Sequence, residues 1–389
     1  MDNSFSSPGT QPASPPPPPL TPPPPVITPP PPAKPRRSWG WIILSVILLV
    51  MLGFSLIGNV VQSFTHSLGA SFSRGYKSGM TREAGPRLDE VTLEDNDAHN
   101  KIAVVTVDGI ITSHSADQAG NNMVDVIKAQ FDRAKDDKRV KAVILKVDSP
   151  GGEVMASDEI NKVIVNFQAD SKKPVICSMG SLAASGGYYI SAPCRWIVAN
   201  DLTITGSIGV IMHGYNWRGL MDKVGVAPMT FKSGKYKDML SPDRNPGEIP
   251  PEEREMVQAL IDETFQKFKG VVRTGRAAAH EKNKAEGKAL ADDWEDYADG
   301  RVLSGTQALT LGFVDQVGDF DEAVEQTKKI AHITDANLIE YRERYDLSDF
   351  LSMFGQSGSA HDIKLDVGLD IPKLRAGCMY FLWQMPENK

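Results

Sequence analysis

The chain has 389 residues, 41% of them hydrophobic and 23% charged, so it is long enough to bury a core and to carry further segments. Its net charge of −7 argues against nucleic acid as the main partner, because surfaces that bind nucleic acid are usually basic. It has neither a His-Glu-x-x-His helix nor a Cys-x-x-Cys pair, so the sequence predicts no metal site and no cofactor.

Residues 1–38 form a tail that holds most of the chain's 27 prolines. Such a tract favours the polyproline II conformation and cannot bury a core, so we expect it to be disordered. It could act as a spacer or as a ligand for an aromatic groove. We favour the interpretation that the tail is a spacer.

Residues 39–61 are expected to form a transmembrane anchor. The run 41–57, extendable to residue 61, is apolar and carries no charge, and about 20 helical residues span a bilayer. Lys34, Arg36 and Arg37 precede it, so the positive-inside rule places the tail in the cytoplasm and the rest of the chain outside. The sequence therefore predicts a single-pass protein of the cell inner membrane, with the lipid bilayer as a partner. It has only a weak cleavage site, which favours an uncleaved anchor.

Residues 62–99 are predicted to be a polar stalk, residues 100–335 a catalytic domain, and residues 336–389 a C-terminal extension. Strands and helices alternate in the catalytic domain, which indicates an α/β fold with parallel strands. The expected strands cover residues 102–107, 109–112, 140–147, 175–179, 196–199, 207–212 and 227–232. The expected helices cover residues 122–136, 153–168, 185–192, 251–279, 305–311 and 321–331. The apolar stretch 378–385 is expected to pack against a neighbour or the membrane surface.

Ser149-Pro-Gly-Gly152 lies between a strand of buried type and a helix. Proline fixes the turn and the paired glycines free the backbone, so that N–H groups face outward at the carboxyl edge of a parallel sheet. The motif alone is most simply interpreted as an ordinary turn between a strand and a helix. A second such turn in the next β-α unit suggests that one turn supplies a nucleophile and the other an oxyanion donor.

Ser185 is in that second turn, within Gly180-Ser-Leu-Ala-Ala-Ser-Gly-Gly-Tyr-Tyr189. A serine between a strand and a helix exposes its hydroxyl beside the first N–H groups of the helix. A nucleophilic hydroxyl needs this setting, because the oxyanion that it generates must meet donors already in place.

The candidate base is a lysine. The seven histidines are mostly in linker, loop or helix-surface segments, and His213, which is close to the motifs, has no acidic residue in an obvious triad relation to it. Lys232, Lys235 and Lys237 cluster shortly after the two turns, and serine–lysine pairs are a known variant of the catalytic triad. Most lysines are simply solvated, so the cluster alone does not identify a base.

These motifs, in this order and spacing, resemble the signal peptide peptidase A family. Ile204-Thr-Gly-Ser-Ile-Gly-Val210, Ser233-Gly-Lys-Tyr-Lys-Asp238 and the later Gly-Phe-Val-Asp315 complete the likeness, which covers about residues 100–350. The resemblance implies a membrane-anchored serine endopeptidase with a β-α superhelix of the Clp protease and crotonase type. It also implies peptide substrates, namely signal peptides already released by cleavage.

The resemblance also assigns roles to residues. It places the nucleophile at Ser185, the general base at Lys237 rather than Lys235, the serine that orients the base at Ser207, and an oxyanion donor at Gly152. A lysine accepts a proton only as the neutral amine, which burial away from carboxylates favours. Related long chains hold two copies of the fold, with lysine in one and serine in the other. This chain has one copy, so the resemblance implies a homo-oligomer in which Ser185 meets the Lys237 of a neighbour.

Two other functions remain open. A crotonase-type acyl-CoA enzyme would share the fold and the oxyanion glycines, but it would need neither the lysine nor an outside location. A non-catalytic membrane scaffold would tolerate the loss of Ser185 or Lys237, and both are present. Of the three cysteines, Cys177 and Cys194 are expected to be buried free thiols.

Overall fold

The computed structural model describes residues 44–53, 55, 85–114, 121–284, 286–344 and 379–382. The chain divides into two compact units, Met1–Arg82 and Glu83–Lys389. In the first unit, residues 44–53 are helical. Among the residues that are described, we find no helix with the length and apolar character needed to cross a bilayer. The proline-rich tail and most of the predicted anchor lie outside the described residues.

The second unit is built on a nine-stranded sheet in the order β1-β11-β2-β3-β5-β6-β10, with β7 paired to β5 and β9 to β7. The strands are β1 (Leu88–Glu94), β2 (Lys101–Asp108), β3 (Val140–Ser149), β5 (Val175–Ala184), β6 (Trp196–Ala199), β7 (Ile204–Gly206), β9 (Val302–Ser304), β10 (Gln316–Val317) and β11 (Asn337–Glu343). Pairing is parallel from β11 through β2, β3, β5 and β6 to β10, and antiparallel at β1. The predicted α/β class with parallel strands is confirmed.

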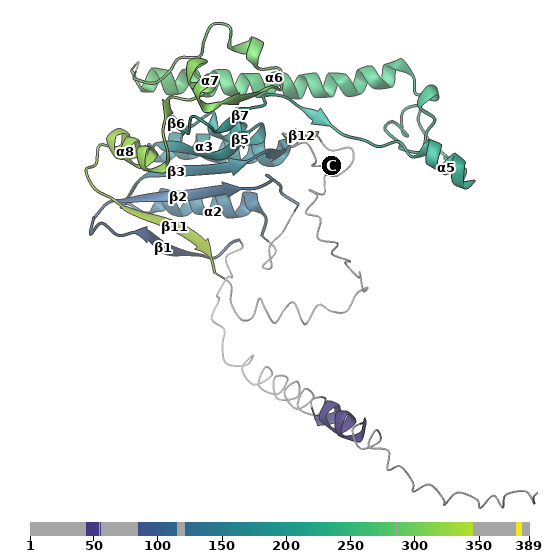
Figure 1. The fold of residues 1–389 in the computed structure, drawn as a ribbon, viewed down its shortest axis with the longest axis horizontal. Helices are drawn as coiled ribbons and strands as arrows, with labels where there is room; N and C mark the ends of the chain where they lie inside the picture. Colours follow the sequence, from purple (N-terminus) through teal and green to yellow (C-terminus); the bar gives the residue numbers. More distant parts are fainter. Residues whose placement is uncertain are drawn as a thin grey trace, which may run out of the picture. The chain divides into compact units, whose positions relative to one another are not determined.

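Helices cover the sheet (Figure 1). They are α2 (Met123–Asp136), α3 (Val154–Ser171), α4 (Gly186–Ser191), α5 (Arg218–Val224), α6 (Pro251–Lys282), α7 (Gly305–Thr310) and α8 (Phe320–Ala331), with short 3-10 turns η1 (Pro246–Glu248) and η2 (Trp294–Tyr297). Helix α2 begins where Asn122 and Asp125 form a capping box, which satisfies backbone N–H groups of the first turn. The central strands β3 and β5 are mostly buried, as expected for a parallel sheet covered on both faces.

A second sheet of three short strands has the order β4 (Gly151–Glu153), β12 (Met379–Leu382) and β8 (Ile211–Met212). Its middle strand, β12, comes from the end of the chain and pairs antiparallel with both neighbours. These residues belong to the stretch predicted to pack against a neighbour or a membrane, whereas the structure pairs them within the chain.

Three predicted strands differ from the observed ones. Residues 109–112 contribute only an isolated bridge between Ile111 and Gly152, and residues 227–232 form no strand. The segment 207–212 is irregular except for β8. Conversely, β1 lies in the predicted stalk and β11 in the predicted extension, so the sheet includes residues on both sides of the predicted catalytic domain. Strand β1 is largely exposed, and its polar sequence is therefore similar to that of a linker.

Candidate functional site

Ser185 lies at the junction of β5 and α4. Its backbone has φ 55° and ψ −115°, a conformation that a residue with a side chain rarely adopts. Two backbone hydrogen bonds hold it: its N–H donates to the Gly206 carbonyl at 2.8 Å, and its own carbonyl accepts from Tyr189 N–H at 2.8 Å. Such strain costs about 1–3 kcal/mol and is concentrated at functional sites. The residue is 1% exposed, so within one chain its hydroxyl is buried and not exposed as predicted.

The glycines of β4 pack directly against this turn. A Cβ on Gly151, where φ is 99°, would lie 2.6 Å from the Gly186 nitrogen, and a Cβ on Gly186 would lie 3.0 Å from the Gly152 nitrogen. Gly152 has no room for a side chain either, because its Cβ would lie 1.9 Å from the Ile111 carbonyl oxygen. The absence of side chains therefore brings the Gly152 backbone beside the Ser185 turn.

Glu153 fixes the loop that carries these glycines. Its carboxylate accepts hydrogen bonds from Thr112 Oγ1 at 2.9 Å and Ser113 N–H at 3.1 Å, and it contacts His114 Nδ1 at 2.6 Å. Burial alone would raise the pKa of Glu153, but these hydrogen bonds outweigh burial and hold the pKa below its ordinary value. Sequence reasoning missed this role. The only signal was an acidic residue directly after the glycine pair.

Asp148 has a similar positioning role, toward the strand that precedes the turn. Its Oδ1 accepts from the Leu182 N–H at 3.1 Å, and a Cβ on Gly180 would lie 2.8 Å from its Oδ2. The carboxylate therefore supports the part of β5 that precedes Ser185.

Ser207 lies close to Ser185 through the backbone. Gly206, the residue before it, accepts the Ser185 N–H and pairs with Ala184 in the parallel ladder of β5 and β7. Ser207 has a φ of 50°, is 6% exposed, and donates its N–H to the Arg301 carbonyl at 2.7 Å. The structure thus brings together three of the four residues predicted for the site: Ser185, Gly152 and Ser207.

Lys237 is exposed and lies on an irregular segment between α5 and α6. The α5 region lies beyond the end of the main sheet (Figure 1). In the part of the chain that the structure describes, no hydrogen bond or ion pair involves the Lys237 amine, so the burial expected for a base is not present within one chain. Its neighbour Asp238 binds Lys232 at 2.8 Å and Arg244 at 3.5 Å.

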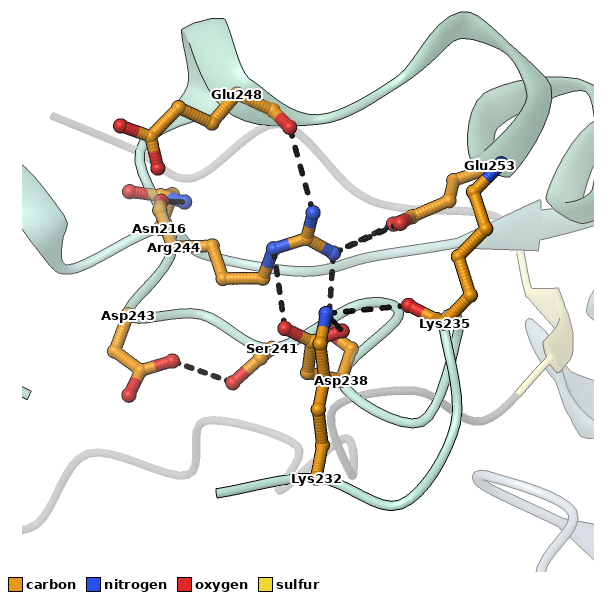
Figure 2. A network of polar contacts seen from close by, with 9 residues as sticks. All are labelled: Asn216, Lys232, Lys235, Asp238, Ser241, Asp243, Arg244, Glu248 and Glu253. Atoms are coloured by element: carbon orange, nitrogen blue, oxygen red, sulfur yellow. Dashed lines mark hydrogen bonds and ion pairs between the residues drawn. The ribbon is translucent and has the colours of Figure 1, made fainter. Parts of the chain in front are cut away.

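A network of charges holds this segment in shape (Figure 2). Arg244 lies at its centre and binds Asp238 and the buried Glu253, the latter at 2.7 Å. Asn216 donates from Nδ2 to the Arg244 carbonyl at 2.8 Å, which ties the segment to the residues before α5. Because Glu253 belongs to α6, the network fixes the segment that carries Lys237 to the long helix.

The remaining polar candidates are less suited to catalysis. Cys177 and Cys194 are free and buried, as predicted, and burial raises the pKa of the Cys194 thiol well above its ordinary value. His213 is exposed. Within the described ranges, no group of His, Cys, Asp or Glu side chains is arranged to hold a metal ion.

Comparison with known proteins identifies similar sequences. Residues 167–334 match the family model described as Peptidase family S49. A protein of Enterococcus faecium named as a signal peptide peptidase, SppA, is 38% identical over 272 residues, which are 68% of this chain and 73% of that protein. Protease 4 of Haemophilus influenzae is 35% identical over 62% of this chain, but the match spans only 36% of that longer protein.

A solved structure is also similar, that of a mutant of the 1510-N membrane-bound stomatin-specific protease. It is 20% identical, with a TM-score of 0.35, and the match covers 59% of this chain and 85% of the other.

Proposed function

The chain belongs to peptidase family S49, and from this membership we propose that it is a serine endopeptidase with Ser185 as nucleophile and Lys237 as general base. The observation that carries the proposal is the strained Ser185 turn packed against the Gly151-Gly152 loop. A serine held in this way, with backbone N–H groups beside it, meets the needs of acyl transfer.

The reaction would follow the logic of other serine peptidases. Ser185 Oγ attacks the carbonyl carbon of the scissile bond while its proton passes to the neutral amine of Lys237. The negative oxygen of the tetrahedral intermediate accepts hydrogen bonds from backbone N–H groups, Gly152 among them. Collapse of the intermediate breaks the C–N bond, and the lysine returns the proton to the leaving amine. Water, deprotonated by the same lysine, then hydrolyses the acyl-enzyme.

We propose that the lysine comes from a neighbouring copy of the chain. Lys237 is exposed, its segment is fixed by the Arg244 network, and α5 lies beyond the sheet. A rigid projecting segment with an unpaired amine is suited to reach the Ser185 of an adjacent subunit. Docking there would remove the amine from water and favour its neutral form, while the Ser207 hydroxyl would orient it.

For substrates, we propose membrane-associated peptides such as released signal peptides. The support is the relative named SppA and the apolar run at residues 41–57, which would anchor the enzyme in the membrane. The predicted topology places the catalytic domain outside the cytoplasm, where such peptides are released.

The proposal is tested by labelling the full-length protein with a fluorophosphonate probe and by mapping the modified residue. We expect modification of Ser185, and loss of labelling and of peptidase activity in Ser185→Ala, by a factor of about 10³ or more. Lys237→Ala should lose both equally, whereas its matched control Lys235→Ala should keep most of the activity. Modification of a different serine, or an essential Lys235 with a dispensable Lys237, would overturn the assignment.

A further inference from the structure

Asp238 directly follows the candidate base Lys237 in the sequence. A lysine accepts a proton only as the neutral amine, and a carboxylate that pairs with the amine favours the charged form instead. An aspartate at this position therefore opposes the action of the base unless its own charge is bound by other groups. The contacts of Asp238 decide between these two cases.

Each oxygen of the Asp238 carboxylate is bound by a cation. Lys232 Nζ lies 2.8 Å from Oδ1, and Arg244 Nε lies 3.5 Å from Oδ2 (Figure 2). The Asp238 side chain is only 12% exposed. The hydrogen bond from Lys232, together with the charge of Arg244, holds the pKa of Asp238 below its ordinary value. The carboxylate is therefore ionised and bound by these two cations, whereas Lys237 is exposed.

Arg244 is held in place by contacts beyond Asp238. Its Nη1 donates to both carboxylate oxygens of Glu253, at 2.7 and 3.0 Å, and its Nη2 donates to the Glu248 carbonyl at 3.4 Å. Nη1 also donates to the backbone carbonyl of Asp238 at 3.4 Å. The hydrogen bond with Glu253 raises the pKa of Arg244 further above its ordinary value. Arg244 is therefore charged, and α6 fixes its position beside Asp238.

The charges of these four side chains cancel, since Lys232 and Arg244 balance Asp238 and Glu253. Other charged side chains lie on the same segment and on the adjoining ends of α5 and α6: Asp222, Lys223, Lys235, Asp243, Glu248 and Glu252. All of these are exposed except Asp243, which accepts a hydrogen bond from the Ser241 hydroxyl. The carboxylate next to Lys237 is thus neutralised by partners within its own segment.

We propose that Lys232 and Arg244 are positioning residues of the peptidase, which hold the Asp238 carboxylate so that it does not pair with the Lys237 amine. The inference rests on the proposed function, in which Lys237 is the general base. Removal of one cation frees one carboxylate oxygen next to the base, and that oxygen then stabilises the ammonium form. The enzyme then needs a higher pH to reach the same activity.

Lys232→Met in the full-length enzyme tests the proposal. Lys232 is 37% exposed, and its amine contacts Asp238 and the Lys235 carbonyl, so methionine removes the charge with little effect on packing. Replacement of Arg244 would instead leave the buried Glu253 without its cation. We expect the rising limb of kcat/KM against pH to move upward by about one pH unit in Lys232→Met, with the plateau at high pH unchanged. A lowered plateau with the limb in place would overturn the proposal.

Removal of the carboxylate shows whether Lys232 acts through Asp238. In an Asp238→Asn background, Lys232→Met should shift the limb no more than the matched control Lys235→Met does, because no carboxylate is left to pair with Lys237. Lys235 is an exposed cation of the same segment, and its amine lies over the Tyr236 ring, 4.8 Å from the centroid. An equal shift from Lys232→Met with and without Asp238 would overturn the proposal.

A measurement on the amine itself separates this proposal from the proposed function. The Ser185→Ala chain is treated with a trace of acetic anhydride between about pH 6 and 10, and acetylation of Lys237, which requires the neutral amine, is followed by mass spectrometry. Half-maximal acetylation should move upward by about one pH unit with Lys232→Met, and not when Asp238→Asn is also present.

The two measurements together identify which assignment fails. If acetylation shifts as expected but Lys237→Ala remains an active peptidase, the role of Lys232 and Arg244 stands and the proposed base is wrong. If Lys237 is essential but neither acetylation nor the pH dependence of kcat/KM responds to Lys232→Met, the role of Lys232 and Arg244 is wrong and the proposed base stands.

Discussion

Two serines of the candidate site, Ser185 and Ser207, have positive φ values although neither is a glycine. Both conformations are imposed by backbone hydrogen bonds to other strands and loops, at Gly206, Tyr189 and Arg301. Since strain of this kind persists only where the surroundings over-determine it, the packing around the turn is as important as the serine itself. The buried residues behind α4 therefore bear directly on the site.

Asp315, in the Gly-Phe-Val-Asp315 motif, supports this packing. Its Oδ2 lies 2.5 Å from Arg276 Nη2, both side chains are fully buried, and it accepts from Ile197 N–H at 2.8 Å. Burial alone would lower the pKa of Arg276, but the Asp315 carboxylate outweighs burial and raises it. Tyr188, two residues after Gly186, donates its hydroxyl to the Phe313 carbonyl close by. The ion pair thus lies close to α4, the helix that follows Ser185.

Asp315→Asn should destabilise the protein by about 3–5 kcal/mol, because it leaves the Arg276 cation buried without its counter-charge. The measurement is urea unfolding of the variant and the wild type. The matched control is Asp299→Asn, since Asp299 and Arg301 form an exposed pair, each 49% exposed, and exposed pairs contribute little. A similar loss of stability in both variants would show that burial of the Arg276 pair is not the cause.

At the scale of elements, the site depends on short strands and loops rather than on long helices. Strand β4 has three residues and β7 also has three, yet they position Gly152 and the acceptor of the Ser185 N–H. Glu153 joins β4 to the loop at residues 111–114 through its carboxylate, as described above. The loop that carries Gly152 should therefore be sensitive to the ionisation of the Glu153 side chain.

The stabilising effect of Glu153 should be lost in acid. Because its pKa in the folded protein lies below the ordinary 4.5, its contribution is fully present above about pH 4.5 and disappears as pH falls through the lowered value. Glu153→Gln should therefore be less stable than the wild type at neutral pH and should converge with it below the folded pKa. Thermal unfolding between pH 3 and 7 measures this, and a stability difference independent of pH would contradict it.

Much of this element arrangement could be predicted from the sequence. The central strands, α2, α4 and α6 follow apolar periodicity and helix-start signals, and the two glycine-containing turns indicated where Ser185 and Gly152 would meet. The residues at 227–232 have strand-like composition, but their side chains are mostly exposed, with Phe231 at 89%, and they have no strand partner. Periodicity reports which residues favour a strand and not whether an edge is available to pair with.

The second, three-stranded sheet could not be predicted. The pairing of β12 with β4 joins residues more than 200 positions apart, and nothing local in either segment specifies the partner. Similarly, Glu153, Asp148 and Asp315 act through contacts with distant backbone groups, so their roles follow from the packed structure alone. The exposed setting of Lys237 within one chain is a further such feature, because motif spacing gives no information on burial.

At the scale of the whole molecule, the predicted topology is open to a direct test. Lys34, Arg36 and Arg37 before the apolar run predict a cytoplasmic tail and an external catalytic domain. In a Cys378→Ser background, a membrane-impermeant maleimide on intact spheroplasts should label Leu93→Cys, whose side chain is exposed, and not Ser7→Cys. Permeabilised cells are the control, in which both should be labelled. Labelling of Ser7→Cys alone in intact spheroplasts would reverse the orientation.

The assembly of several copies of the chain is a second property of the whole protein. With the proposed roles, Lys237 on a projecting segment and Ser185 in a buried turn can meet in a head-to-tail contact between copies of the chain. Such contacts close into a ring when the rotation allows. An enclosed ring would also shield folded proteins from a nucleophile of broad specificity.

The most direct test of a Ser185–Lys237 pair formed between copies is subunit mixing. Ser185→Ala and Lys237→Ala chains, each inactive by itself, are co-expressed in equal amounts and assayed on a peptide substrate. In a randomly mixed ring, half of the subunits supply the serine and half of their neighbours supply the lysine, so about a quarter of the wild-type activity should return. Mixed assemblies that stay inactive, while a monomeric wild-type chain cleaves the same peptide, would contradict the account.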